Sequence, residues 1–117
     1  MIKWIIIFLV VLFIVSRMMP RKGINNITVA MAKEKMKDKN VQFIDVRTPG
    51  EYKARHEKKF KNIPLADLAS VLNTLDKEQE VVVICQSGMR SAKATNLLKK
   101  NDFTKVFNVQ GGMSAWK

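Results

Sequence analysis

Apolar residues follow two different patterns along this chain, one continuous and one periodic. The continuous pattern covers the N-terminus, where the run from Trp4 to Val15 contains no polar side chain. Beyond residue 23, short apolar runs alternate with stretches in which apolar residues recur at helical spacing. Strands that alternate with helices predict an α/β domain with a mainly parallel central sheet flanked by helices. We therefore predict an N-terminal apolar helix over residues 1–19, a basic linker over 20–23 and one folded domain over 24–117.

Short apolar runs predict the strands of this domain, and amphipathic stretches predict its helices. Val81 to Ile84 are four β-branched residues in a row, which is typical of a strand buried on both faces. Thr28 suits the N-cap of a helix, and Pro49 with Gly50 predicts a turn. The other predicted strands are 24–27, 41–46, 62–64 and 106–109, and the predicted helices are 29–40, 65–75 and 91–100.

The N-terminal apolar run is predicted to be an uncleaved transmembrane anchor. A helix over residues 1–19 would reach about 28 Å, close to the roughly 30 Å hydrocarbon core of a bilayer. A secretory signal peptide would need small residues before a cleavage site, and residues 16–22 offer no such site. A buried core helix is the other alternative, but nothing polar interrupts the run and no capping residue precedes it.

The charges that flank this run predict its orientation. Arg17, Arg21 and Lys22 lie on its C-terminal side, against Lys3 and the amino terminus on the other side. The tendency of positive residues to remain inside predicts a single-pass membrane protein with its domain on the cytoplasmic side. The cysteine count agrees, because the chain has one cysteine and oxidising compartments favour paired ones.

The composition limits the partners that we expect. The formal net charge is +11, and the most basic segment runs from Lys53 to Lys61. A solvated face is the usual explanation of such a segment, and contact with anionic lipid is the alternative. Nucleic acid is not expected, because no aromatic interleaving or recognised binding motif accompanies the charge. A single histidine and a single cysteine leave little to bind a metal, and no cofactor is predicted.

The strongest chemical signal follows the buried strand. Cys85 ends the strand, residues 86–88 suit a tight loop, and a helical pattern begins after Ser91. A strand that turns abruptly into a helix leaves several backbone N–H groups pointing into the turn, at the positive end of the helix dipole. A thiol at this position ionises more easily, because the thiolate is the form that the site favours. Arg90 adds a planar cation that can hold an oxyanion at two points.

The alternative for Cys85 is a buried and inert core residue, which is the usual fate of a lone cysteine at the end of an apolar strand. A glycine, an arginine and a helix start all follow within six residues of it. This combination favours a reactive thiol.

Four stretches resemble the rhodanese family of sulfurtransferases, and they occur in the order of that family. Residues 85–91, Cys-Gln-Ser-Gly-Met-Arg-Ser, are similar to its active-site loop. The resemblance extends over roughly residues 24–116. The other similar stretches are 43–47 with Glu51 and Tyr52 for the first signature, 62–65 for the end of the second, and 106–116 for the C-terminal signature.

The resemblance implies a rhodanese-like three-layer α/β fold and sulfane-sulfur transfer. The Cys85 thiolate would take sulfur from thiosulfate or a persulfide donor and pass it to a thiol, cyanide or a protein acceptor. His56 is kept from the segment that precedes the second signature, but the glycines and apolar residues around it are replaced. The residues implied to bind substrate are Gln86, Ser87, Gly88, Met89 and Arg90, and those implied to support the site are Asp45, Arg47 and Ser91.

Two other functions are weighed against this one. The first is a membrane-tethered persulfide carrier that hands sulfur to a neighbour with little turnover. The second is a phosphatase or arsenate reductase, since cell-cycle dual-specificity phosphatases resemble rhodaneses in fold. Only four residues separate Cys85 from Arg90, one fewer than in those phosphatases, and a smaller loop suits a single sulfur atom better than phosphate. The donor, the acceptor and the oligomeric state are not predicted.

Overall fold

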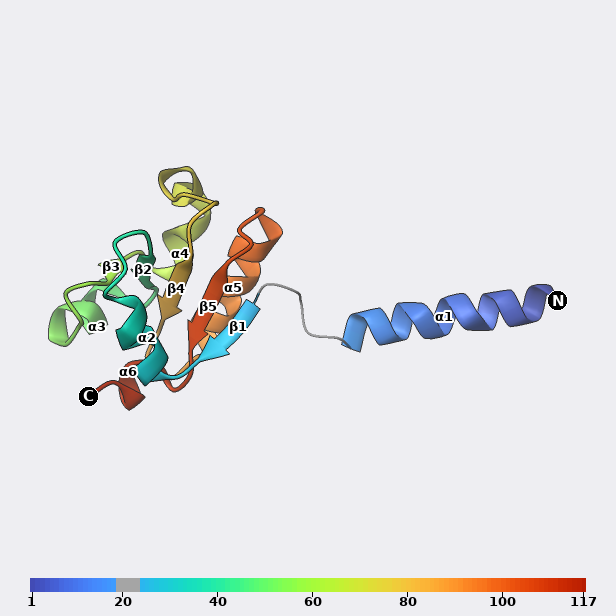
Figure 1. Ribbon diagram of the computed structural model, residues 1–117, viewed down its shortest axis with the longest axis horizontal. Coiled ribbons are helices and arrows are strands. Elements are labelled where there is room, and N and C mark those ends of the chain that lie inside the picture. Colours follow the sequence, from blue (N-terminus) through green and yellow to red (C-terminus); the bar gives the residue numbers. More distant parts are fainter. Residues whose placement is uncertain (19–23) are drawn as a thin grey trace.

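The computed structural model describes residues 1–18 and 24–117, and the folded part of the chain is built around one sheet (Figure 1). Five strands run parallel in the order β1-β5-β4-β2-β3, which places β4 at the centre. The prediction of a parallel sheet with flanking helices is confirmed. The strands are β1 Ile24–Ile27, β2 Gln42–Asp45, β3 Lys61–Asn62, β4 Val81–Ile84 and β5 Val106–Val109.

Helices follow most of these strands and cover both faces of the sheet (Figure 1). Buried residues of α4 and α5 belong to one core cluster, and buried residues of α2 and α6 belong to the cluster on the opposite face. The helices of this domain are α2 Val29–Lys35, α3 Pro49–Ala54, α4 Leu65–Leu68, the 3₁₀ helix η1 Ala69–Thr74, α5 Met89–Lys100 and α6 Gly112–Ala115.

The central strand β4 joins the two core clusters. Its side chains alternate between the faces, so Val81 and Val83 pack toward α5 while Val82 and Ile84 pack toward α2. All four residues are fully buried, as the run of β-branched residues predicts for a strand that is covered on both sides. Cys85 continues the alternation and lies on the α5 face.

Local capping explains where the helices differ from the sequence predictions. The turn predicted at Pro49 and Gly50 is instead the first turn of α3. Thr48 and Glu51 form a capping box there, in which the side chain of each residue accepts from the backbone N–H of the other. The predicted helix 65–75 divides into α4 and η1, and the helix predicted over 29–40 ends at Lys35.

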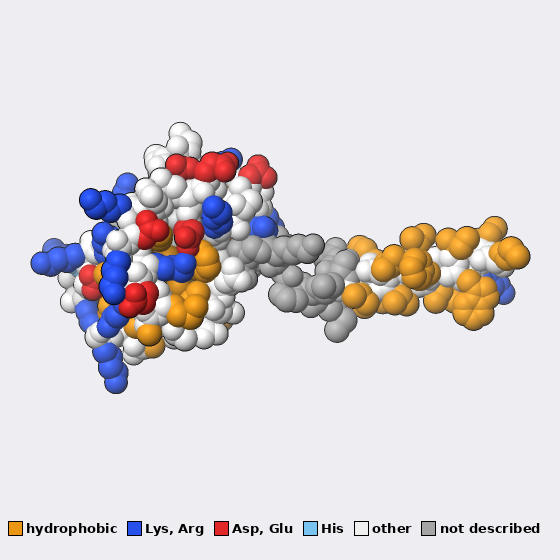
Figure 2. Space-filling model, viewed as in Figure 1, with side chains coloured by type: hydrophobic (Ala, Val, Ile, Leu, Met, Phe, Trp, Pro, Cys, Tyr) orange, Lys and Arg blue, Asp and Glu red, His pale blue; other side chains and the backbone are white. Residues whose placement is uncertain are grey.

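The N-terminal run forms α1, Ile2–Met18, which has 17 residues. Such a helix spans about 26 Å, less than the roughly 30 Å hydrocarbon core of a bilayer. Within residues 1–18 and 24–117, no helix is both long and apolar enough to cross a membrane. The predicted transmembrane anchor is therefore wrong, and so is the predicted single-pass localisation with a cytoplasmic domain. Figure 2 shows the apolar side chains of α1, which are exposed from Ile2 to Val15.

Part of the predicted domain organisation falls on residues that the structure does not describe. Residue 19, the last of the predicted N-terminal helix, and the predicted basic linker 20–23 lie outside the described residues. The domain boundary at residue 24 stays a prediction.

The basic segment 53–61 is anchored by aromatic side chains and exposes its lysines (Figure 2). Phe60 is buried and meets the rings of Phe43 and Trp116 edge to face. Tyr52 donates its hydroxyl to the Phe60 carbonyl at 2.6 Å, and the ring of His56 stacks on the Tyr52 ring at 3.9 Å. His56 thus has a packing role that its sequence context did not suggest.

Candidate functional site

The candidate site is the loop between β4 and α5, at the edge of the sheet where parallel strands end. Cys85 is the first residue after β4, and α5 begins at Met89 with Gly88 as its N-cap. Ile84 is paired with Asp45, so the residues that follow β2 lie beside this loop. In parallel α/β sheets, the carboxyl ends of the strands are the usual place for a ligand site.

Hydrogen-bond donors surround the sulfur of Cys85. The backbone N–H of Gly88 donates to Cys85 Sγ at 2.9 Å, and Ser91 Oγ lies 3.3 Å from the same sulfur. Gly88 adopts φ +115°, a left-handed conformation that a residue with a side chain rarely takes. Cys85 itself is only 1% exposed, so these donors and the core enclose the sulfur almost completely.

These donors change the acidity of the thiol. Burial raises the pKa of the Cys85 thiol, but hydrogen bonds from the Ser91 side chain and from the backbone N–H groups of Ser91, Gly88 and Ser87 outweigh it. The pKa of Cys85 therefore lies below its ordinary value. A thiolate accepts several hydrogen bonds well and a neutral thiol accepts them poorly, so the loop favours the ionised form.

The segment at α6 holds the loop from behind. The backbone N–H of Met113 donates to the Cys85 carbonyl at 2.8 Å, and the N–H of Ser114 donates to the Gln86 carbonyl at 3.0 Å. Because a trans peptide is planar, a carbonyl directed at α6 sends the N–H of the same peptide unit the opposite way, into the loop. Gly112 makes this approach possible, since a Cβ there would overlap the Cys85 carbonyl oxygen.

Arg90 lies at the rim of the loop and is paired with Glu51 of α3. Its Nη1 and Nη2 donate to Glu51 Oε1 and Oε2 at 2.6 and 2.8 Å. The hydrogen bond from Arg90, with that from the Thr48 backbone, holds the pKa of Glu51 at about 2. The predicted anion-binding cation is therefore already balanced by a carboxylate. An anionic substrate would have to compete with Glu51 or share the guanidinium with it.

A hollow of about 340 Å³ has Arg90 in its lining. Its lining is mostly apolar and brings Arg90 together with residues that follow β2 and β3. The residues that line it are Val46, Thr48, Pro64, Leu65, Ala66 and Arg90.

The Asp45–Arg47 pair, predicted to support the site, lies beside the loop and is buried. Arg47 donates from Nε and Nη2 to the Asp45 carboxylate at 2.8–3.1 Å. The guanidinium also donates to Gln86 Oε1 at 3.2 Å and to the Arg55 carbonyl at 2.5 Å. Arg47 thus connects the end of β2 with the Cys85 loop and with the basic segment.

The remaining predicted site residues face outward to different extents. Gln86 is half-buried between Arg47 and Ser114, to which its Nε2 donates at 3.2 Å. Ser87 and Met89 are exposed on the outer side of the loop. The structure therefore gathers Gln86, Gly88 and Ser91 around Cys85 and leaves the side chains of Ser87 and Met89 open to solvent.

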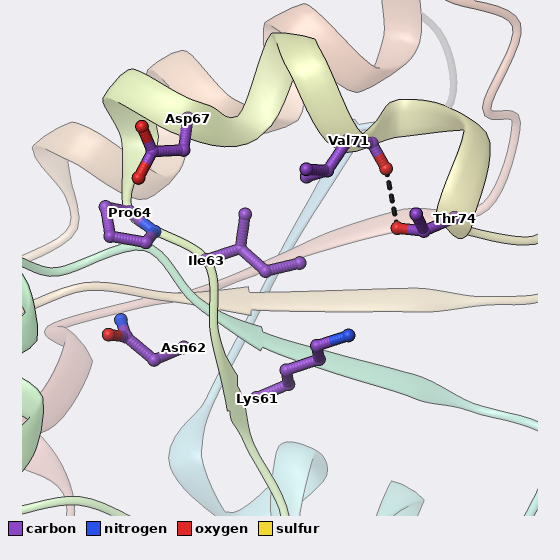
Figure 3. Close-up of a pocket in the computed structure, with 7 residues that line it drawn as sticks. All are labelled: Lys61, Asn62, Ile63, Pro64, Asp67, Val71 and Thr74. Carbon is purple, nitrogen blue, oxygen red and sulfur yellow. Dashed lines mark hydrogen bonds between the residues drawn. The ribbon is translucent and has the colours of Figure 1, made fainter.

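A second hollow, of about 270 Å³, is lined by residues that run from β3 to η1 (Figure 3). None of residues 85–91 lines it, so it offers no route to the sulfur. In residues 1–18 and 24–117, no cluster of three metal-ligating side chains accompanies either hollow. The lining consists of Lys61, Asn62, Ile63, Pro64, Asp67, Val71 and Thr74.

Sequence reasoning missed the roles of two residues that contact the site. Glu51 belongs to the first signature, and the pattern Thr48-Pro49-Gly50-Glu51 signals a capping box that would have placed it at a helix start. Asn108 contacts Ser91 from β5, with its Oδ1 2.5 Å from Ser91 Oγ. A polar residue at an inward position of an apolar strand was the signal available for Asn108.

Comparisons with known proteins identify relatives of this chain. The family model described as the rhodanese-like domain matches residues 28–117. "Putative sulfurtransferase YtwF" of Bacillus subtilis is 39% identical over 95 residues, 80% of this chain and 91% of YtwF. "Putative sulfur carrier protein YrkF" of the same organism is 36% identical over 95 residues, 80% of this chain and 51% of YrkF.

A solved structure matches as well. The crystal structure of a rhodanese-like domain protein from Staphylococcus aureus superposes with a TM-score of 0.73 at 35% identity, covering 80% of this chain and 91% of that one. Two of the curated relatives extend well beyond the match, since the chain spans 62% of one and 51% of the other.

Proposed function

This chain belongs to the rhodanese-like domain family, and from that premise we propose that it transfers sulfane sulfur through a persulfide on Cys85. The observation that carries the proposal is the setting of Cys85 Sγ, to which the Gly88 N–H donates at 2.9 Å and beside which the Ser91 hydroxyl lies at 3.3 Å. Donors that are already in place stabilise a charge at that position without reorganising during the reaction. The same donors suit the thiolate before the reaction and the persulfide anion after it.

The first step loads the cysteine. The Cys85 thiolate attacks the outer sulfur of thiosulfate, the S–S bond of thiosulfate breaks, and sulfite leaves with the bonding electron pair. Cys85 then carries a persulfide anion. In the second step a nucleophile, such as cyanide or a thiolate, attacks the terminal sulfur and the Cys85 thiolate departs. No oxidant or reductant is consumed, because in each step one nucleophile displaces another from the transferred sulfur atom.

The acceptor must come from outside the chain. Cys85 is the one cysteine in the sequence, so no second thiol can attack the persulfide and form an internal disulfide. We propose that Arg90 contributes to binding of an anionic donor by sharing its guanidinium between the donor and Glu51. Gln86 and Gly88 would shape the loop around the transferred sulfur.

Intact mass spectrometry tests the loading step. The full reduced chain incubated with thiosulfate should gain the mass of one sulfur atom, and cyanide should remove it as thiocyanate. Cys85→Ser should stay unmodified. Loading should rise with pH and reach half its maximum below the pKa of an ordinary cysteine, because the thiolate is the attacking form and the pKa of Cys85 is lowered. An unchanged mass in the folded, reduced protein, with thiosulfate and with an organic persulfide, would refute the proposal.

A persulfide carrier is the second candidate, and the burial of Cys85 favours it. With the residue 1% exposed, a persulfide at this position is shielded from thiols in solution. Turnover separates the two candidates. A carrier should load one sulfur per chain and release thiocyanate slowly, whereas an enzyme should release many equivalents from thiosulfate and cyanide.

Hydrolysis of phosphate esters is not part of the proposal. The loop is one residue shorter than a phosphatase loop, and Arg90 is occupied by Glu51. We expect negligible hydrolysis of p-nitrophenyl phosphate by the full chain. Phosphatase turnover that exceeds sulfur transfer and disappears in Cys85→Ser would overturn the proposed function.

A further inference from the structure

A line of hydrogen-bonded side chains leads from the sulfur of Cys85 to the surface. Cys85 Sγ lies 3.3 Å from Ser91 Oγ, and Ser91 Oγ lies 2.5 Å from Asn108 Oδ1. Asn108 Nδ2 in turn lies 3.0 Å from Oδ1 of Asn26, its partner on the neighbouring strand β1. Ser91 is fully buried, Asn108 is 7% exposed and Asn26 is exposed. The hydrogen-bonded line therefore begins in the core and ends in solvent.

The Ser91 hydroxyl has one hydrogen to donate and three possible acceptors. The Gly88 carbonyl, at 3.1 Å, already accepts from the N–H of Ala92 at the same distance. Asn108 and Cys85 are therefore the two groups that compete for the Ser91 hydrogen. At 2.5 Å, two oxygen atoms must share a hydrogen, since without one they would repel each other. While Asn108 presents Oδ1, the Ser91 hydrogen is held by Asn108, and Ser91 can only accept from the Cys85 thiol.

Ionisation of Cys85 reverses what the sulfur needs. A thiol has a hydrogen to give to Ser91 Oγ, whereas a thiolate or a persulfide anion has none and requires the Ser91 hydrogen. Asn108 must then present Nδ2 to Ser91, so that its amide donates where it previously accepted. Such a turn exchanges groups of nearly equal shape. Asn26 is also an amide and can turn in the same way, because it is exposed and water can satisfy its other groups.

We propose that Asn108 is a positioning residue, and that Ser91, Asn108 and Asn26 form a hydrogen-bond chain whose direction reverses with the protonation state of Cys85. When Asn108 accepts from Ser91, the Ser91 oxygen accepts the hydrogen bond of the neutral thiol. When Asn108 donates to Ser91, the Ser91 hydroxyl donates its hydrogen bond to the sulfur anion. The proposal deepens the proposed sulfur transfer and rests on it only for its purpose, since that reaction starts from a thiolate on this sulfur and returns to one when the sulfur is handed on.

The charged groups around the loop are paired with one another rather than with Ser91. Arg90 from α5 is paired with Glu51 from α3, and Arg47 after β2 is paired with Asp45. In each pair a carboxylate balances the guanidinium at 2.6–2.8 Å. From β5 the neutral amide of Asn108 reaches Ser91, and the amide of Asn26 on β1 reaches Asn108.

Two substitutions of Asn108 separate the hydrogen-bond chain from a merely structural role. Asn108→Asp places a carboxylate, which has acceptors only, against Ser91. It should keep the Ser91 hydrogen away from sulfur and lower the fraction of thiolate at neutral pH about tenfold. Asn108→Leu removes both the donor and the acceptor, which frees the Ser91 hydrogen for the sulfur. This variant should keep the wild-type fraction of thiolate or exceed it.

The measurement is the rate at which iodoacetamide alkylates Cys85 in the full-length protein, followed against pH. Combining Ser91→Ala with Asn108→Asp controls for the direct effect of the new negative charge on Cys85. The double variant keeps the carboxylate but lacks the Ser91 hydroxyl that connects it to the sulfur. In the Ser91→Ala background, Asn108→Asp should lose most of its effect. Asn26→Asp is a further variant on an exposed residue that tolerates change. By fixing Asn108 with Nδ2 outward, it should shift the pH profile in the same direction as Asn108→Asp, and by less.

The possible outcomes differ in what they imply. Opposite behaviour of Asn108→Asp and Asn108→Leu, with the Asn108→Asp effect dependent on Ser91, supports the hydrogen-bond chain. Equal loss of thiolate in both Asn108 variants, or an Asn108→Asp effect that survives in full without Ser91, overturns it. Alkylation requires no sulfur donor, so its result stands apart from the proposed function. The expected pH profiles without any persulfide formation would refute sulfur transfer and leave the hydrogen-bond chain in place.

Discussion

Two arginine–carboxylate pairs lie at the same edge of the sheet, and they differ in burial. The side chains of Arg47 and Asp45, beside the end of β2, are 3% and 0% exposed, with an Nη2 to Oδ2 distance of 2.8 Å. Those of Arg90 and Glu51, at the start of α5, are 35% and 34% exposed, with an Nη1 to Oε1 distance of 2.6 Å. The chemistry and the distances are similar, so environment alone distinguishes the pairs.

This difference separates scaffold from rim. Arg47 donates to protein groups, including Asp45, Gln86 and the Arg55 carbonyl, and no water could replace them at that depth. Arg90 faces solvent on one side, where water or an anionic ligand can replace a carboxylate oxygen. The sequence does not show that Arg47 and Arg90 have different roles, although each is paired with a carboxylate. Their burial does.

The largest expected effect comes from removing one partner of the buried pair. Asp45→Ala leaves the Arg47 guanidinium buried with no carboxylate, which typically costs about 3–5 kcal/mol of unfolding free energy. Denaturant unfolding of the full chain measures it. Glu51→Ala is the matched control and should cost under about 1 kcal/mol, because its partner can turn to water. Equal losses in the two variants would contradict the distinction between scaffold and rim.

The same contrast can be tested with two glycines. Gly112→Ala forces a Cβ against the Cys85 carbonyl at φ +54°, and we expect a loss of about 1–3 kcal/mol together with slower alkylation of Cys85. Gly50→Ala, in α3, is the control, since a Cβ there meets none of the described residues within 4 Å. It should leave stability unchanged or raise it by about 0.4–1 kcal/mol. A Gly112→Ala protein with normal stability and normal thiol reactivity would show that the support from α6 is dispensable.

Arg90→Ala sharpens the proposal that the rim pair handles an anionic donor. Loss of one charged hydrogen-bond donor should slow loading from thiosulfate about tenfold, and unfolding free energy should change by less than about 1 kcal/mol. Alkylation of Cys85 by iodoacetamide should stay within about twofold of wild type, because that reagent carries no charge for the guanidinium to bind. In loading from thiosulfate, Arg90→Lys, which keeps the charge but not the two-point geometry, should fall between wild type and Arg90→Ala. Equal slowing with both reagents would place Arg90 in the scaffold beside Arg47.

The smallest effect is a pH dependence of stability that belongs to the rim pair. The pKa of Glu51 is lowered from 4.5 to about 2, so its contribution is fully present above pH 4.5 and is lost as pH falls through about 2. Because the pair is one-third exposed, solvent screening limits this contribution to less than about 1 kcal/mol. Thermal unfolding of wild type and Glu51→Gln between about pH 5 and about pH 2 measures it. The two curves should converge as the pH falls, and a constant difference would mean that the carboxylate does not titrate in this range.

Patterns that depend on neighbours along the chain were predictable. The buried strand β4, the loop that begins at Cys85 and the helix behind it follow from β-branched residues, turn residues and helical spacing that lie within one short stretch. The helix α3 was missed because proline and glycine were interpreted as a turn, although Thr48 and Glu51 carried a capping signal. The N-terminal run was interpreted as a spanning helix over residues 1–19, whereas α1 has 17 residues, Ile2–Met18.

Contacts between residues distant in the sequence were not predictable. Glu51 and Arg90 are 39 residues apart, and Asn26 and Asn108 are 82 apart. No local period connects such residues, and only the parallel register of β1 with β5 and of β2 with β4 brings them together.

The sequence by itself determined that a thiol ends a buried strand at the start of a helix, because strand formation, turning and helix capping depend on short-range sterics and hydrogen bonds. Tertiary structure decided how that thiol is supported. Gly112 brings α6 against the loop carbonyls, Glu51 occupies Arg90, and Asn108 reaches Ser91 from β5. Each of these contacts is made across the sheet edge or between layers, where packing rather than chain connectivity sets which groups meet.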